Sequence, residues 1–197
     1  DSVECYIKVN EDFQKEINGL FRGLDKSYSL AVLDISDINH VRFAQRNEKA
    51  GYQPGSVGKI AVLIGLFNQL AKIYPDDFEK RLELLRNKSV KSGLWGLTDE
   101  HTVPIYTRGA NNYVGDKGGS IGTTLGLMKF LVQLEQGNVI DEASSLEMKR
   151  LMYMTDRRIR YAQSPALKEA AVYFKSGSLY KCDRSNGEAC GKYMGNV

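Results

Sequence analysis

The sequence predicts an α+β fold in which one antiparallel sheet is assembled from both ends of the chain. Strand patterns occur near each end, and a block of helical patterns lies between them. The composition, 42% hydrophobic and 26% charged residues, is that of a globular protein. A length of 197 residues suits a single domain, residues 1–197, rather than two.

The N-terminal part predicts one helix and a hairpin. Residues 11–22 place four apolar side chains on one helical stripe, those of Phe13, Ile17, Leu20 and Phe21. Residues 29–35 and 41–45 have strand character, and the polar residues 36–39 between them favour a turn.

The centre of the chain predicts two helices. Residues 57–73 are apolar on most of a helical circumference, so we expect a helix buried in the middle of the domain. Asp76 or Asp77 is a suitable cap for a second helix that extends to about Asn87.

Two more helices and three strands complete the expected fold. Thr123 or Thr124 caps a helix that Gly137 ends, and Asp141 caps the next one. Three segments near the C-terminal end have strand character: 171–175, 179–181 and 191–197.

Charge, histidine content and hydropathy exclude several classes of function. The net charge of +3 comes from 27 basic and 24 acidic residues that are interspersed, which argues against a nucleic-acid partner. His40 and His101 each stand alone, and no zinc-type ligand spacing occurs, so we expect no metal and no cofactor. No uninterrupted apolar run reaches the ~18 residues of a membrane helix, so we expect no membrane-spanning segment.

A serine and a lysine stand one turn apart at the start of the apolar helix. Residues at positions i and i+3 share a helix face, so Lys59 can lie beside the Ser56 hydroxyl. A serine hydroxyl needs a base to become a nucleophile, and burial in an apolar helix would lower the pKa of a lysine toward the range of a base. A capping serine followed by a surface lysine is the alternative interpretation of this pair.

A second short motif follows the strand expected at 171–175. Lys175, Ser176 and Gly177 form a K-S-G triad, and Ser178 comes next. On an edge strand, such a triad supplies positive charge, a hydroxyl for a substrate carboxylate and a glycine that lets a substrate approach the backbone. Three residues alone are equally typical of a turn.

Together, S-x-x-K followed by K-S-G resembles the class A β-lactamases and the penicillin-binding serine hydrolases. Residues 122–127 and 134–137 also resemble the helix that precedes the K-[ST]-G strand in that family. The resemblance implies a β-lactamase/transpeptidase-like fold, with helices on the sheet and a helical lobe. It implies that Ser56 is acylated, that Lys59 is its base and that Lys175 and Ser176 hold the substrate carboxylate. It further implies an oxyanion hole from the N–H groups of Ser56 and Ser178.

The sequence departs from that family in three ways. No serine or tyrosine is followed two positions later by asparagine, so the S-x-N element is absent, and the E-x-x-x-N loop has no match between Arg108 and Ser120. Only one strand is expected after the K-S-G strand, where the family has two. We expect a stretch of the natural chain to be missing near 103–111, between Thr107 and Arg108, and the C-terminal strands to be truncated. A degenerate relative that kept the fold and lost activity is the alternative.

The expected activity is that of a serine hydrolase or acyl-transfer enzyme. The resemblance implies β-lactams, D-Ala-D-Ala-like peptidoglycan peptides or esters as substrates, without resolving which. Two alternatives stay open. The first is a non-catalytic binding or scaffold protein on the same fold, and the second is an unrelated α+β domain that carries both motifs by chance.

The cysteines bear on the compartment. Cys182 and Cys190 flank a polar, turn-rich loop, and a disulfide between them would fit if the flanking strands pair. Such a bridge predicts an oxidising, extracytoplasmic location, either periplasmic or secreted. The alternative is two unrelated thiols, and the pattern does not indicate the state of Cys5.

Overall fold

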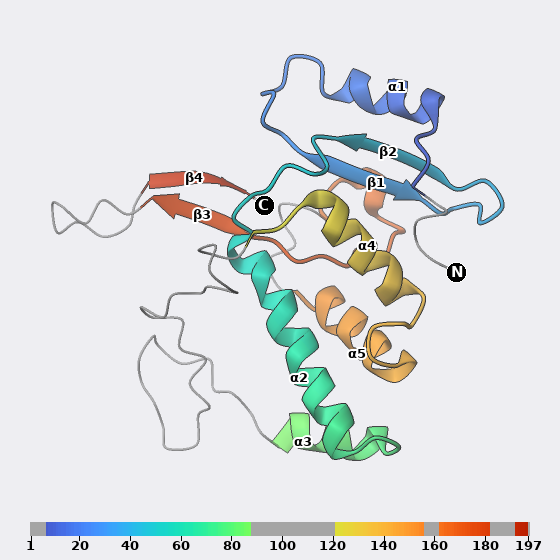
Figure 1. Ribbon diagram of the computed structural model, residues 1–197, viewed down its shortest axis with the longest axis vertical. Coiled ribbons are helices and arrows are strands. Elements are labelled where there is room, and N and C mark those ends of the chain that lie inside the picture. The colour runs from blue at the N-terminus through green and yellow to red at the C-terminus, as the bar shows by residue number, and fades with distance from the viewer. Residues whose placement is uncertain (1–6, 88–120, 156–161, 182–191, 197) are drawn as a thin grey trace, which may run out of the picture.

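The computed structural model describes residues 7–87, 121–155, 162–181 and 192–196 (Figure 1). The α-helices in chain order are α1 (Glu11–Leu20), α2 (Lys59–Ile73), α3 (Phe78–Asn87), α4 (Thr124–Glu135) and α5 (Glu142–Tyr153). The strands are β1 (Leu30–Asp34), β2 (Arg42–Arg46), β3 (Ser178–Lys181) and β4 (Lys192–Asn196). Two 3-10 helices, η2 (Gly55–Gly58) and η4 (Pro165–Leu167), complete the elements.

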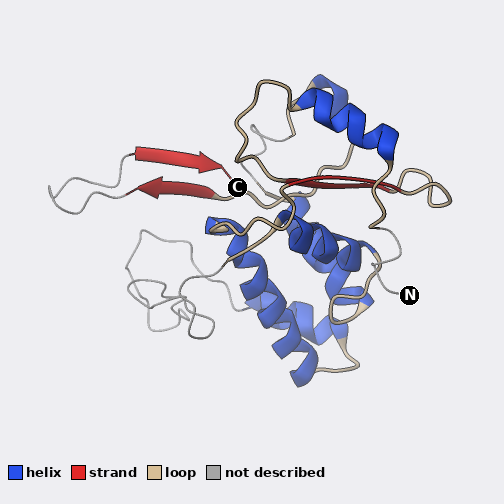
Figure 2. Cartoon of the chain, turned by 45° about the horizontal axis from the view of Figure 1, so that its top comes forward, coloured by secondary structure: helices blue, strands red, loops and turns tan. Residues whose placement is uncertain are grey.

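The N-terminal hairpin lies between two helices. β1 and β2 pair antiparallel with Val32 opposite Ala44, which confirms the hairpin expected from the sequence. Figure 2 shows this sheet edge-on, with α1 on one face and α4 on the other, and α1 packs on β2 while α4 packs on β1. Phe13 and Ile17 of α1 form a buried cluster with Ala44.

A second buried cluster joins the helices below the sheet. Its members come from α2, α4, α5 and the turn between the last two: Phe67, Leu70, Leu134, Val139, Met148 and Met152. The two clusters share no residue, so the described part of the chain has two separate hydrophobic cores.

The helix starts follow the capping chemistry read from the sequence. Asp77 accepts a hydrogen bond from the Lys80 amide, Thr123 from Gly126 and Asp141 from Ser144, so each closes the first turn of its helix. Gly137 has a φ of +73°, the left-handed conformation in which glycine ends a helix at low cost.

The expectation of an α2 buried on all sides is wrong. Phe67 and Leu70 are buried, but Val62, Leu66 and Ile73 are 49%, 44% and 57% exposed in the structure as described. One side of the helix packs into the second cluster and against α3. Apolar residues around the whole helix therefore did not mean that other elements pack against all of its sides.

The run Gly55–Ile73, which joins η2 to α2, is long and apolar enough to cross a membrane. It has 19 residues and a mean hydropathy of 1.3, although single polar residues interrupt its apolar stretches. Length and composition alone do not separate a membrane span from the core helix of a globular protein.

The single sheet expected from both chain ends is not formed by the described residues. β1–β2 and β3–β4 are two separate two-stranded sheets, and the strand expected at 171–175 has no ladder partner among them. That segment lies instead against the end of α5, where the Thr155 hydroxyl oxygen is 3.0 Å from the Met152 carbonyl oxygen and 3.4 Å from that of Phe174, so its single proton is shared between the two carbonyls. The expected join at 103–111 and the Cys182–Cys190 bridge lie outside the described residues.

Candidate functional site

The loop before Ser56 is tied to the start of α4. Tyr52 and Gly122 exchange two backbone hydrogen bonds, N–H to carbonyl in each direction, both 2.9 Å long. The Leu125 amide also donates to the Glu48 carbonyl at 3.1 Å. These bonds fix the chain that enters η2 against a helix from a distant part of the sequence.

Ser56 itself lies in a tight turn whose geometry depends on Gly55. Gly55 has a φ of +50°, a conformation that costs a residue with a Cβ about 1–2 kcal/mol. The Val57 amide donates to the Pro54 carbonyl at 2.9 Å, and the Val57 side chain is buried. Ser56 is thereby held half-buried at the entry to α2.

Lys59 reaches the Ser56 hydroxyl, as the i, i+3 spacing predicted. Its ammonium Nζ donates to Ser56 Oγ at 3.4 Å. The expectation that Lys59 is buried in an apolar helix is wrong, because Lys59 is exposed. It lies at the first position of α2, before the apolar side of that helix meets its neighbours.

Lys175 is the more buried of the two lysines at the site. It is half-buried, and its Nζ donates to the Ser176 carbonyl at 2.6 Å. Burial lowers the pKa of Lys175, and the positive charge of Lys59 lowers it further.

The K-S-G triad therefore comes to the S-x-x-K turn. β3 packs against η2, and Gly177, the residue before β3, is buried. One detail differs from the sequence expectation, because Lys175, Ser176 and Gly177 precede the strand rather than lie on it. Ser178 is the first residue of β3, and its place in an oxyanion hole with Ser56 stays a prediction.

The charge at this site is unbalanced. Within the described ranges, no carboxylate forms an ion pair with Lys59 or Lys175, whereas six other lysine and arginine side chains have acidic partners there. Two neighbouring ammonium groups without a counter-ion favour an anionic ligand.

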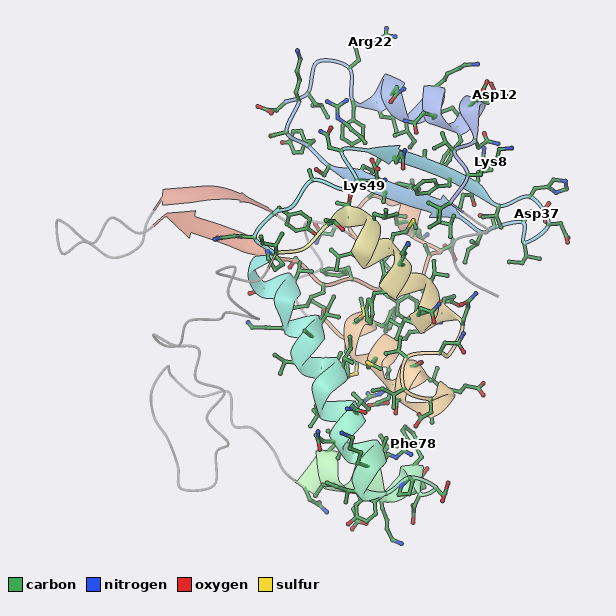
Figure 3. The ribbon with its side chains drawn as sticks, viewed as in Figure 1. Lys8, Asp12, Arg22, Asp37, Lys49 and Phe78 are labelled. Atoms are coloured by element: carbon green, nitrogen blue, oxygen red, sulfur yellow. The ribbon has the colours of Figure 1, made fainter. Side chains whose placement is uncertain are left out.

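Other candidate chemistry lies elsewhere or is not found. No cluster of metal-ligating side chains occurs in the part of the chain that the structure describes. His40 is exposed in the turn between β1 and β2, where its Nδ1 lies 2.7 Å from Asp37 Oδ2 (Asp37 is labelled in Figure 3). An open apolar groove of about 480 Å³ lies between β1 and α4, and none of the candidate site residues lines it.

Sequence reasoning missed the residues that hold the segment before Lys175. Tyr173 stacks with Tyr153 of α5 at a ring-centre distance of 5.5 Å and a tilt of 48°. Lys149 lies over the Tyr173 ring with its Nζ 5.5 Å from the centre. A usable signal existed, because Lys149 and Tyr153 are four residues apart on one predicted helix face.

No protein-family model matches this chain, and no match was found among curated proteins or among solved structures. The resemblance to the penicillin-binding serine hydrolases accordingly stays an expectation that rests on the sequence motifs.

Proposed function

We propose that this chain is a serine acyl-transfer enzyme of the penicillin-recognising type, with Ser56 as the residue that is acylated. The observation that supports this proposal most directly is the meeting of Ser56, Lys59 and Lys175 at the start of α2. Two short motifs that chance could supply singly come from distant parts of the chain to one place.

The chemistry requires a proton acceptor beside the hydroxyl. In the acylation step, a neutral lysine amine takes the Ser56 proton while Oγ bonds to the substrate carbonyl carbon. The amide or ester bond then breaks, and the lysine returns the proton to the leaving group. Lys59 is the proposed acceptor because its nitrogen lies within reach of Oγ.

The substrate class follows from the charge of the site. A β-lactam and a D-Ala-D-Ala-like peptide both carry a carboxylate, which suits Lys59 and Lys175, two cations that form no ion pair with a carboxylate of the described residues. In this proposal Lys175 and Ser176 hold that carboxylate, and Gly177 and Ser178 line its approach. No cofactor takes part. A peptidoglycan-directed or β-lactam-directed enzyme of this kind would act in the periplasm or outside the cell.

One observation favours a second candidate function. The sequence contains no S-x-N or Y-x-N element, the third catalytic group of the family that it resembles. A non-catalytic binding protein that uses the same site for a carboxylate ligand would need no such element. This candidate predicts binding without a covalent adduct.

Intact-mass spectrometry after incubation with benzylpenicillin or an activated ester separates the two functions. We expect the mass to rise by one acyl group in the wild type and not to change in Ser56→Ala. That variant should keep its stability within about 1 kcal/mol, because the hydroxyl supplies at most a capping interaction. Ser164→Ala is the matched control, since Ser164 precedes η4 without a side-chain capping bond. An adduct in Ser56→Ala would contradict the assignment, and no adduct in the wild type would favour the binding protein.

A further inference from the structure

The segment that leads into Lys175 is held from one side by α5. Exposure alternates along it, with Ala171 and Tyr173 exposed and Val172 and Phe174 half-buried. Such alternation is typical of an extended chain, in which residues two apart share a side. Tyr173 is two residues before Lys175, so the position of its ring is closely coupled to the path of the chain at Lys175.

Three contacts join this segment to α5 and the residues just after it, and a fourth joins α5 to α4. The Tyr173 ring stacks on Tyr153 and lies under Lys149, both from α5. Lys149 in turn forms an ion pair of 2.7 Å with Glu135 at the end of α4. One residue further on, the Thr155 hydroxyl oxygen lies 3.4 Å from the Phe174 carbonyl oxygen. Glu135, Lys149 and Tyr173 therefore form a continuous connection from α4 to the chain before the K-S-G triad.

We propose that Tyr173 is a positioning residue that holds Lys175 beside Lys59 and Ser56 through its contacts with Tyr153 and Lys149. Tyr173 does not reach the reacting atoms in this proposal. Its ring contacts two side chains of α5 and thereby joins the chain before Lys175 to that helix. The meaning of this placement for acyl transfer rests on the proposed function, but the placement itself is tested without it.

The position of Lys175 has a measurable consequence. Burial and the charge of Lys59 both lower the pKa of Lys175, and each depends on where the side chain lies. Of the described charged groups, Lys59 is the one that acts on the Lys175 ammonium, because Lys149 is paired with Glu135. If the segment loosens, Lys175 gains water and moves away from Lys59, so its pKa rises toward the ordinary value of a lysine.

Competitive labelling with trace acetic anhydride across a pH series, read by peptide mass spectrometry, measures this pKa on the full chain. We expect the labelling curve of Lys175 to move to higher pH in Tyr173→Ala. It should stay in place in Tyr173→Phe, which keeps the ring. Tyr153→Leu removes the partner ring without altering the segment, and it should move the curve in the same direction. Tyr28→Ala is the control, because Tyr28 is an exposed ring that packs on Phe21 instead.

The outcomes separate this inference from the proposed function. An unchanged curve in both Tyr173→Ala and Tyr153→Leu overturns the inference, whether or not Ser56 is acylated. A shifted curve together with an unreactive Ser56 supports the inference and removes the acyl-transfer proposal. When Ser56 does react, the pH profile of acylation should move with the labelling curve in Tyr173→Ala and recover in Tyr173→Phe.

Discussion

Lys59 and Lys175 belong to two motifs that meet where β3 packs against η2, and they differ in their access to water. Lys59 is exposed and touches Ser56, whereas Lys175 is half-buried and has a lowered pKa. Burial is the main cause of the lowered pKa of Lys175, and the positive charge of Lys59 adds to it. The short path for the Ser56 proton is at Lys59.

Replacing Lys59 tests its role as the proton acceptor. We expect Lys59→Ala to slow acylation by about 10²–10⁴-fold while substrate binding weakens far less, because proton transfer contributes in the transition state. The acylation rate constant is measured by rapid quenching and mass spectrometry, and the effects on kcat and on KM are determined separately. Lys72→Ala, at the far end of the same helix, is the control. An unchanged rate in Lys59→Ala would transfer the role of base to another group.

Gly55 sets the turn that presents Ser56. We expect Gly55→Ala to lower the free energy of unfolding by about 1–2 kcal/mol, because its φ of +50° is strained for a residue with a Cβ. Acylation should fall as well, since relief of that strain displaces the hydroxyl. Urea unfolding gives the first quantity, and Gly19→Ala, next to the last residue of α1 and with open space around it, is the control. Equal stabilities for Gly55→Ala and the wild type would refute the strain argument.

At the scale of the elements, local chemistry was predictable and partners were not. Thr123, Gly137 and Asp141 mark helix ends through hydrogen bonds and a backbone angle that involve only their near neighbours, so the sequence located those ends to within a residue or two. The Ser56–Lys59 contact was predictable for the same reason. The exposure of Lys59 and of one side of α2 depends on which elements pack there, and the spacing of apolar residues does not predict this.

Segment 171–175 shows the same limit. Its β-branched and aromatic residues suit a strand, but strand formation needs a partner edge, and the described residues offer none there. The contact of Tyr173 with α5 was equally beyond the reach of the sequence pattern.

Arg81 joins three elements and is the sharpest test of element packing. Its guanidinium is buried and donates to the Tyr74 and Pro75 carbonyls and to Asp141 and Ser144. We expect Arg81→Ala to cost about 3 kcal/mol in urea unfolding, because several polar partners lose their donor. Arg150→Ala removes an exposed pair with Glu147 and should cost less than about 1 kcal/mol. Similar decreases in the free energy of unfolding of the two variants would show that the buried guanidinium does not stabilise the packing of these elements. The Arg81 guanidinium lies over the ring of Phe78, the first residue of α3, which Figure 3 labels beside the C-terminal end of α2, away from the Ser56 turn.

For the whole molecule, two hydrophobic cores imply two regions of different stability. The hairpin and α1 share one cluster, and α2, α4 and α5 share the other. α4 links them, since it packs on β1 and also contributes to the second cluster. The candidate site lies at the start of α2, so its geometry depends mainly on the second core.

Acid should destabilise the fold through Asp141. Burial acts to raise the pKa of this carboxyl, but hydrogen bonds from Arg81 and Ser144 outweigh it and lower the pKa below its usual value. The stability from this group is therefore complete above the unfolded pKa, about 4, and is lost as the pH falls through the lower folded value. Thermal melting between pH 6 and pH 2.5 should show a smaller acid loss in Asp141→Asn than in the wild type. Parallel curves would contradict this linkage.

The hydrogen-bonded amides of Tyr52 and Gly122 allow the opening of the site loop to be measured. Each is protected only while the two-residue bridge is closed, so their deuterium uptake reports how often the chain before Ser56 lifts from the start of α4. An occupant that stays on Ser56 would slow both amides together. Their shared exchange rate thus reports whether a bound ligand holds this bridge closed, without any chemical turnover.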